Sequence, residues 1–288
     1  MPILGSFGAG SGKGYGMTAG GNPYMVANGG TVTEDGVYKV HVFTSPGTFT
    51  VEKAPDPALA TADYLVIAGR GGPAPSCRGG AAGGYRESNP GAGDWTGSPL
   101  ANPGGSLSLS VQGYPINVGS NAAPQPSQNT QGYQGGPSTF STITSSGGGG
   151  CGVGHYTQPV KSNPGLPGGC GGSGGGYPEN PGAGGGSGNK GGYSPPEGQP
   201  GAWNGGGGVQ VSAGGGCQGT GTEFTANVTD VGVPGPTGGL KYFAGGSGQG
   251  CPAPVNGGGP TVPQGGTEQA YGAAGGPSGV VCIRYRYK

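Results

Sequence analysis

Residues 147–176 read GGGGCGVGHYTQPVKSNPGLPGGCGGSGGG, and they open a stretch, residues 147–276, in which 48 of 130 residues are glycine. Glycine loses more backbone entropy on ordering than any other residue, so it is unfavourable in helices and weak in strands. One interpretation is a disordered low-complexity segment. The other is an ordered bundle of polyproline-II chains, which have three residues per turn, no internal hydrogen bonds and outward-pointing N–H and C=O groups. Such chains can bond laterally where side chains are absent.

Three features of this stretch favour the ordered bundle. The glycine blocks are separated by short turn-like segments rich in Pro, Asn and Tyr, such as residues 177–181. Large residues such as Phe243 interrupt the run, whereas a flexible linker is mostly Gly and Ser. Charge is sparse, so no repulsion holds the segment open. The sequence therefore predicts polyglycine-II-like packing of residues 147–276.

The composition excludes several classes of protein. Leu, Ile, Val and Phe are scarce, which makes a large conventional core doubtful. The 12 basic and 12 acidic residues cancel, so there is no electrostatic signature of nucleic-acid or anionic-membrane binding. No apolar run reaches the roughly 18 residues of a membrane-spanning helix. The first seven residues lack the features of a secretory signal, which predicts synthesis and folding in a cytoplasm.

The residues that usually carry chemistry show no catalytic or metal-binding pattern. The six cysteines have no CxxC pair, and in a reducing compartment we expect free, buried thiols and no metal or other cofactor. Gly10 to Lys13 lacks the strand and helix of a phosphate loop. His41 alternates within a strand and is expected on its surface. The aspartates are isolated, so the interpretation is a protein that is not an enzyme.

The remaining sequence predicts strands. Alternating or continuous apolar patterns predict them at residues 31–44, 48–51, 62–69, 106–111, 115–118, 138–144, 222–229 and 278–288. Residues 62–69 are continuously apolar and are expected to be buried on both faces, whereas 278–288 is expected to be half-buried. Leu107, Leu109 and Val111 alternate and are expected to be buried. No stretch has a 3.6-residue apolar period, so the predicted fold class is all-β with essentially no α-helix.

The order of these elements predicts a domain layout. A C-terminal strand has only the early strands to pair with, so the glycine stretch becomes an insertion whose ends meet at one small β-sandwich. The expected parts are an extended N-terminal arm (residues 1–30), a β-sandwich base (31–146 plus 277–288) and a glycine-rich head (147–276). The arm is expected to attach to a partner or to be ordered by one.

The sequence resembles a known class of proteins along most of its length. The segments VYKVHVFTSPGTFTV (37–51), ADYLVIAGRGG (62–72), LSLSVQGYPINVGS (107–120), STFSTITSSGGGG (138–150) and GGPSGVVCIRYRYK (275–288) resemble glycine-rich virion proteins of tailed bacteriophages. They are similar in style to the polyglycine-II fibre-tip adhesins of T-even-like phages. That resemblance implies a virion protein, made in the host cytoplasm, whose bundle carries receptor-binding loops. The alternative is a purely structural virion component such as a capsid decoration, head fibre or connector.

Aromatic residues on glycine-rich turns are the candidate receptor-binding residues. Rigid rings amid Ser, Gly and Asn are typical of recognition loops, and rings with polar edges suit sugars and protein loops. The alternative for each ring is that it packs along the bundle in place of aliphatic residues. The candidates are Trp95, Tyr133, Tyr156, Tyr177, Tyr193 and Trp203. The expected partners are other virion proteins, a host surface glycan or outer-membrane protein, and further copies of the chain in a trimer.

Overall fold

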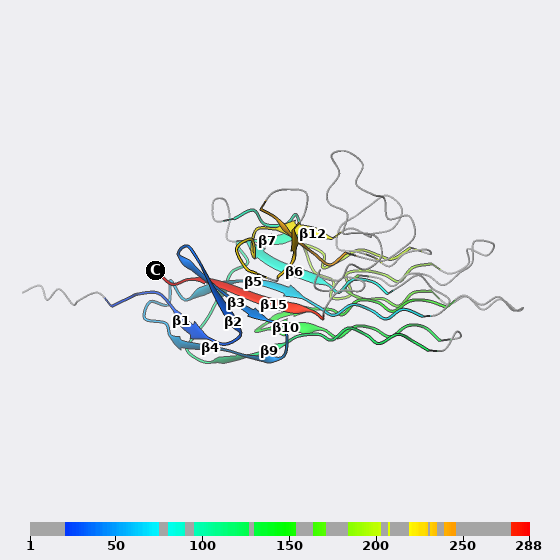
Figure 1. The fold of residues 1–288 in the computed structure, drawn as a ribbon, viewed down its shortest axis with the longest axis horizontal. Helices are drawn as coiled ribbons and strands as arrows, with labels where there is room; N and C mark the ends of the chain where they lie inside the picture. The colour runs from blue at the N-terminus through cyan, green and yellow to red at the C-terminus, as the bar shows by residue number, and fades with distance from the viewer. Residues whose placement is uncertain are drawn as a thin grey trace, which may run out of the picture.

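The chain forms an all-β structure. The computed structural model describes residues 21–74, 80–89, 95–126, 130–153, 164–170, 184–202, 207, 219–229, 231–234, 239–245 and 278–288. These residues contain strands and turns, and the described part of the chain has no helix. Figure 1 shows the strands gathered at one end of an elongated molecule, with long non-strand segments extending from them.

The strands form three sheets. The five-stranded sheet has the order β1 (Val26–Asn28), β4 (Gly47–Lys53), β9 (Gly113–Asn117), β10 (Ser138–Phe140) and β11 (Ile143–Ser145). The seven-stranded sheet has the order β2 (Thr31–Asp35), β3 (Tyr38–Phe43), β15 (Val280–Arg286), β5 (Thr61–Ile67), β6 (Tyr85–Asn89) and β7 (Ala101–Pro103), and β8 (Leu107–Ser108) pairs with β5. A three-stranded sheet contains β12 (Thr220–Thr222), β14 (Lys241–Phe243) and β13 (Val233–Pro234).

The two larger sheets pack face to face as a β-sandwich. One apolar cluster combines Phe49, Tyr114 and Phe140 of the five-stranded sheet with residues of the seven-stranded sheet, such as Val66 and Ile283. The rings of Phe49 and Phe140 meet edge to face, with centroids 5.9 Å apart. Edge-to-face pairs stabilise a core beyond what their buried area contributes, so a small number of aromatic residues is enough for this small core.

A second apolar cluster covers the outer face of the seven-stranded sheet. There Leu65 of β5 and Cys282 of β15 pack with Phe224, Val228 and Phe243 from residues 219–245. Strand β5 is therefore buried on both faces, which confirms the prediction from its continuous apolar run. Strand β15 is also buried on both faces rather than half-buried. Even Arg284 is 5 % exposed, because residues 219–245 cover it.

The C-terminal strand closes the sandwich as the sequence predicted. Strand β15 is central in the seven-stranded sheet and lies antiparallel between β3 and β5, with Ile283 opposite both His41 and Tyr64. The glycine-rich sequence between β11 and β15 is therefore an insertion between two strands of the sandwich.

Several local predictions differ from the structure. Residues 31–44 form two strands, β2 and β3, because Gly36 turns the chain with a φ of +60°. The turn after β3 leads into β4 of the other sheet, so these two strands do not form a hairpin. In the predicted strand 222–229, only Thr222 is in a strand, and turns follow. In the predicted strand 106–111, Val111 is 59 % exposed, because the chain turns before β9.

His41 was expected on a strand surface, and this prediction is wrong. Its side chain is fully buried in the sandwich, stacked on Tyr285 and edge-on to Phe49. Its Nδ1 lies 2.7 Å from the carbonyl oxygen of Gly29, while Nε2 has no hydrogen-bond partner among the described residues. Burial lowers the pKa of His41 below its ordinary value, because the imidazolium form would be desolvated.

Strand β6 was missed because its polar residues do not resemble a buried strand. Glu87 is 1 % exposed, and its carboxylate accepts hydrogen bonds from Tyr85 OH at 2.7 Å, Ser98 N at 3.0 Å and Thr222 Oγ1 at 2.5 Å. Burial raises the pKa of Glu87, although these hydrogen bonds oppose the rise. The buried carboxylate of Glu87 thus connects β6 to β12 through its hydrogen bond with Thr222. No periodicity in the sequence indicates that Glu87 is buried.

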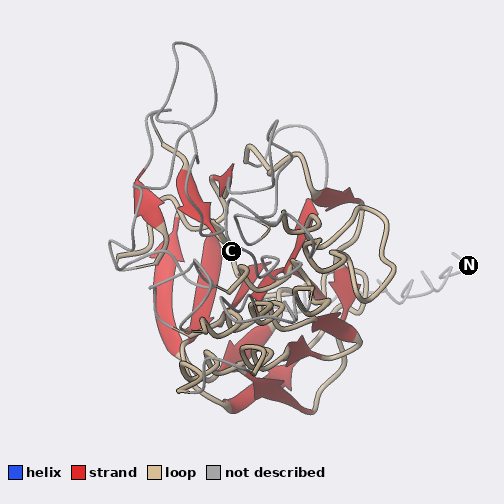
Figure 2. Cartoon of the chain, turned by 90° about the vertical axis from the view of Figure 1, so that its right-hand side faces the viewer, coloured by secondary structure: helices blue, strands red, loops and turns tan. Residues whose placement is uncertain are grey.

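The non-strand segments form a laterally bonded array. We define this glycine array as segments 68–73, 80–84, 119–125, 131–136, 147–151, 165–170, 184–188 and 197–201, with Gly207. Segment 147–151 exchanges main-chain hydrogen bonds with four neighbours, namely segments 68–73, 80–84, 131–136 and 165–170. A β-strand can have only two neighbours in its sheet, so this arrangement is not a β-ladder. Figure 2 shows these segments end on, running side by side.

The bonds of the array repeat every three residues. Gly148 N and Cys151 N donate to Gly69 O and Gly72 O, while Gly132 N and Gly135 N donate to Cys151 O and Gly148 O. Donors and acceptors three residues apart thus point at the same neighbour, which is the spacing of a polyproline-II helix. A Cβ on Gly147 would lie 1.8 Å from Gly135 O, so the close approach of these chains requires glycine.

The array includes segments from both sides of the predicted domain boundary at residue 147. Segments 68–73, 80–84 and 131–136, which the sequence analysis assigned to the base, bond to segment 147–151, and segment 119–125 of the base bonds to segments 68–73 and 131–136. Residues 26–28, which it assigned to the arm, form β1 in the sandwich. Residues 1–20 of the arm and much of residues 147–276 lie outside the described residues. The prediction of polyglycine-II packing therefore remains a prediction for those parts.

Candidate functional site

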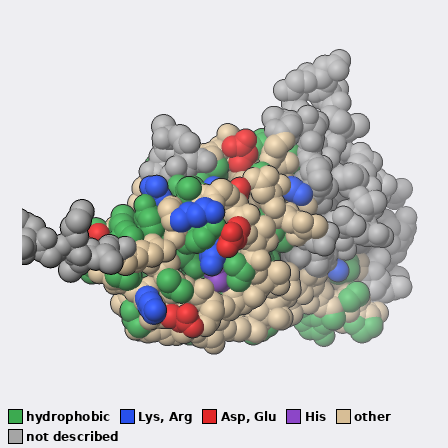
Figure 3. All heavy atoms as spheres, turned by 60° about the vertical axis from the view of Figure 1, so that its left-hand side comes forward, with side chains coloured by type: hydrophobic (Ala, Val, Ile, Leu, Met, Phe, Trp, Pro, Cys, Tyr) green, Lys and Arg blue, Asp and Glu red, His purple; other side chains and the backbone are tan. Residues whose placement is uncertain are grey.

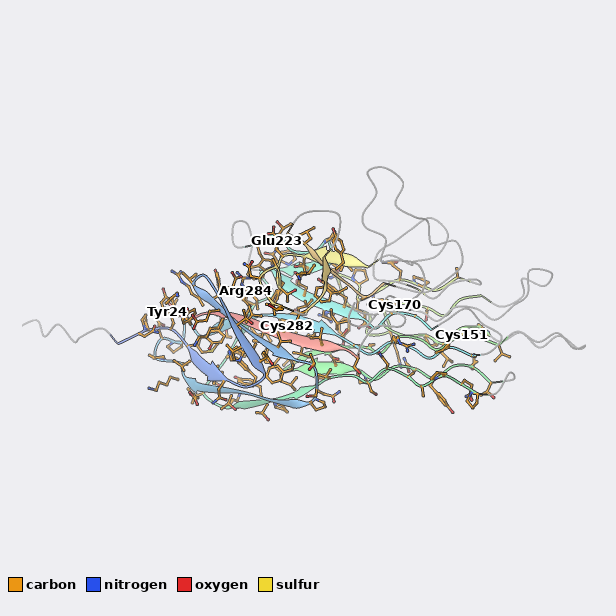
Figure 4. All side chains as sticks on the ribbon, in the orientation of Figure 1. Tyr24, Cys151, Cys170, Glu223, Cys282 and Arg284 are labelled. Carbon is orange, nitrogen blue, oxygen red and sulfur yellow. The ribbon has the colours of Figure 1, made fainter. Side chains whose placement is uncertain are left out.

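The molecule has two distinct ends. Near the C-terminus Tyr287 O accepts a 3.0 Å hydrogen bond from Asn22 Nδ2, so the first described residues and the last lie together on the sandwich. The array extends in the opposite direction, and in Figure 4 Cys151 lies far along it, whereas Tyr24 and Arg284 lie at the sandwich end. Cys151, on the described part of the array, is therefore remote from both described chain ends.

Tyr133 is an exposed aromatic residue on this array. Its side chain is 53 % exposed, and it lies between Gly132 and Gln134 on a segment hydrogen-bonded to three neighbouring segments. Gln131 Nε2 and Gln134 Nε2 donate to Pro164 O and Pro167 O at 2.6 and 3.0 Å. These two contacts repeat at a three-residue interval and fix the segment that presents the Tyr133 ring. Among the predicted site residues, Tyr133 is the one whose described side chain is exposed.

A second loop, residues 189–199, is held by two polar side chains. Glu197 is fully buried, and its carboxylate accepts hydrogen bonds from Ser146 N at 2.7 Å and Gly191 N at 2.9 Å. Asn189 Oδ1 accepts from Tyr193 N, and Asn189 Nδ2 donates to Tyr193 O. The loop is thus fixed internally and to segment 147–151. Sequence analysis missed both residues, although an isolated Glu between Pro196 and Gly198 was an available signal.

Tyr193, a predicted site residue in this loop, is partly covered. The Arg86 guanidinium lies 3.7 Å from the Tyr193 ring centroid, which is a cation–π contact. A Cβ on Gly191 would lie 1.9 Å from Cε2 of the same ring. The ring is therefore in close contact with both residues, and the described geometry matches the packing alternative better than free presentation.

Trp95 also occupies a packing position. Its side chain is 9 % exposed and meets Phe224 edge to face. The Arg284 guanidinium lies 4.6 Å from the Trp95 ring and 4.3 Å from the Tyr38 ring, and its Nη1 lies 3.1 Å from Asp35 Oδ2. Arg284 is thus a buried cation held between two aromatic rings. The structure does not bring Trp95 together with Tyr133 or Tyr193.

The other three predicted site residues, Tyr156, Tyr177 and Trp203, lie outside the described residues. Residues of the array flank each of them in sequence: Cys151 and Gly165 flank Tyr156, Cys170 and Gly184 flank Tyr177, and Gly201 and Gly207 flank Trp203. Tyr156, Tyr177 and Trp203 therefore remain predicted receptor-binding residues.

The cysteines do not all behave as predicted. Cys151 is disulfide-bonded, so the expectation of six free thiols is wrong at this position. Cys170 and Cys282 are free, and burial raises the pKa of both thiols well above the ordinary value. A buried thiol with a raised pKa is a poor nucleophile at neutral pH, so these two residues serve packing.

Charge is sparse and mixed on the described surface. Figure 3 shows a few basic and acidic side chains intermixed on the sandwich, in agreement with the zero net charge. In the described part of the chain, no group of three or more His, Cys, Asp or Glu residues could hold a metal ion. None of the described residues forms a helix long and apolar enough to span a membrane.

Comparison with known proteins does not assign a family or a function to the chain. No family model, no curated protein and no solved structure matches the chain.

Proposed function

We propose that this chain is a bacteriophage virion appendage protein, of the tail-fibre or tail-tip type, that contacts the host cell surface through loops of the glycine array. The observation that carries the proposal is the separation of the two ends. The first and last described residues lie on the sandwich, where attachment to other virion proteins is possible, and the described part of the array extends away from them as far as Cys151. The resemblance of the sequence to glycine-rich phage proteins supports the same role.

The array is suited to presenting loops. Its segments are held by main-chain bonds in several directions at once, so its rigidity depends little on the side chains of the turns. Turns on such a support lose little conformational entropy when they bind, which favours affinity. The ligands that fit exposed aromatic and amide groups are a surface glycan or a loop of an outer-membrane protein. The particle can carry the protein as a trimer, and no enzymatic step is needed.

A purely structural role in the virion is the second candidate. Trp95 and Tyr193, two of the aromatic residues predicted to bind a receptor, are packed against Arg284 and Arg86. If the remaining aromatic residues pack similarly in the assembled particle, the protein is a decoration, head fibre or connector without a receptor.

Binding of the purified, fluorescently labelled protein to host cells distinguishes these roles. We expect saturable binding that falls at least tenfold in a variant with Tyr133→Ala, Tyr156→Ala, Tyr177→Ala and Trp203→Ala. Val111→Ala is the matched control, because Val111 is 59 % exposed on the sandwich and precedes β9. Binding of the wild-type protein no greater than background would refute the attachment role and favour the structural one. Antibody labelling of intact particles locates the protein on fibre, tail or capsid.

A further inference from the structure

A groove of about 480 Å³, with both apolar and polar groups in its lining, lies where the array leaves the sandwich. It is formed by the turn between β3 and β4, the end of β9 and the residues after it, the two residues before β10, and Ser278, two residues before β15. Its lining includes Ser45, Pro46, Asn117, Ser120, Pro137 and Ser278. Its volume is within the range of about 300–1,000 Å³ of ligand pockets in proteins. The attachment role proposed above uses aromatic residues of the glycine-rich segments and not the groove itself, and it shares only Tyr133 with the site proposed below.

The groove offers hydrogen-bonding groups that the fold does not use. In the described part of the chain, no residue forms a hydrogen bond with the hydroxyls of Ser45, Ser120 or Ser278. Asn117 Nδ2 donates to Pro137 O at 2.6 Å, which fixes the amide and leaves its Oδ1 available as an acceptor. The hydroxyls can donate or accept, so the groove can satisfy a ligand that is itself rich in hydroxyl groups.

The described residues that line the groove include no Asp, Glu, Lys, Arg or His. An ionic ligand would lose hydration there without gaining a counter-charge, which is unfavourable. The Pro46 and Pro137 rings instead offer apolar faces beside the polar groups. This combination of neutral hydroxyl, amide and ring surfaces matches an uncharged saccharide.

The three-residue repeat extends the groove along the array. Gly136 lines the groove, and Tyr133 precedes it by three residues in a segment whose hydrogen bonds repeat every three residues. The two residues therefore project from the same face, one turn apart, which is about 9 Å at about 3.1 Å per residue. The exposed Tyr133 ring is then a flat surface for a second part of a longer ligand.

We propose that this groove is a binding site for neutral oligosaccharides, with Ser45, Asn117, Ser120 and Ser278 contacting the first units and Tyr133 a later unit. The test is saturation-transfer NMR and titration calorimetry on the full chain. The probes are neutral glucans, mannans and galactans of two and six hexose units, with sulfated hexamers of each as charged counterparts. We expect transfer from the protein to at least one neutral series and none to its sulfated form.

Two variants and one control localise the site. Ser120→Phe fills the groove from an exposed position, and we expect at least a tenfold loss of affinity for both lengths. Tyr133→Ala should weaken the six-unit probe at least fivefold and leave the two-unit probe unchanged. Val111→Ala should change neither, and equal melting temperatures should show that all variants are folded. Absence of transfer to every neutral probe, or unchanged binding by Ser120→Phe, would overturn the proposal. Cell binding is measured separately on Ser120→Phe, which keeps all four aromatic residues of the attachment variant, so failure of this site is distinguishable from failure of attachment.

Discussion

Substitution of one array glycine tests whether lateral main-chain bonding holds this structure together. In Gly150→Ala, the new Cβ would lie 1.9 Å from Gly132 O and 2.4 Å from Gly132 C. An ordinary C···O contact is about 3.3 Å, so segments 147–151 and 131–136 would have to separate by about 1.4 Å. The obstacle is main chain rather than a flexible side chain, so local rotation of a side chain cannot relieve it.

That separation would break the bonds between the two segments. Gly132 N donates to Cys151 O at 2.8 Å and Gly135 N to Gly148 O at 2.9 Å, and both distances would exceed 4 Å. Counting one unsatisfied buried group for each of the two broken bonds, at about 1–3 kcal/mol each, gives a loss of about 2–6 kcal/mol. Replacing glycine by alanine returns only about 0.4–1 kcal/mol through the unfolded state, which leaves a net loss of about 1–6 kcal/mol. At about 2 °C per kcal/mol, Tm should fall by about 2–11 °C.

Gly184→Ala is the matched control for this substitution. Gly184 also belongs to the array, because its carbonyl accepts a hydrogen bond from Gly165 N at 3.1 Å. A Cβ added there would have no atom of the described residues within 4 Å, and its φ is not in the left-handed region. Its Tm should therefore equal or slightly exceed that of the wild type. Calorimetry gives Tm, and hydrogen exchange of residues 131–151 reports the array directly. Equal Tm values and equal hydrogen exchange in the two variants would refute the claim that lateral main-chain hydrogen bonds stabilise the array.

Three further predictions concern buried polar groups. The pKa of His41 is lowered in the folded state, so the free energy of unfolding should be constant above about pH 6.5 and fall below it, because the unfolded chain takes up the proton first. Melting curves from pH 7.5 to 5 measure this. In His41→Phe the melting temperature should change less between pH 6.5 and 5. Glu197→Gln should cost about 1.5–3 kcal/mol, because Ser146 N and Gly191 N donate to different carboxylate oxygens and glutamine places an NH2 donor where one of those oxygens was. Faster exchange of one of these two amides should accompany the loss. Arg284→Ala should lower the free energy of unfolding, measured by urea denaturation, by about 3–5 kcal/mol, since Asp35 loses its ion pair and the rings of Tyr38 and Trp95 lose their cation. A loss below about 1 kcal/mol would contradict the interpretation of Arg284 as a buried cation.

The sheets were largely predictable because apolar periodicity reports burial directly. The continuous run 62–69 predicted a strand buried on both faces, and the tail 278–288 predicted a closing strand. The burial of the second face of β15 was not predictable, because the residues that cover that face, such as Phe224 and Phe243, are distant in sequence. His41 was misplaced for the same reason: its partners Gly29 and Tyr285 come from other elements.

Polar positions were the least predictable part of the candidate site. Glu87 and Glu197 are buried because main-chain and hydroxyl donors converge on them from separate segments, and a single sequence contains no record of that convergence. For the aromatic candidates, sequence alone gave exposure and packing as open alternatives. The structure shows that Tyr133 is exposed, whereas Trp95 and Tyr193 pack against arginine.

The three-residue repeat of the array restricts how its segments can change in length. Insertion of one residue in a segment would turn every later side chain by about a third of a circle. The paired contacts of Gln131 and Gln134 with Pro164 and Pro167 would then be lost together, and side chains would replace glycine against the neighbouring chain. Three added residues would keep each side chain facing its original direction. Segments can therefore lengthen only in steps of three, while the connecting turns are free to differ by any number of residues.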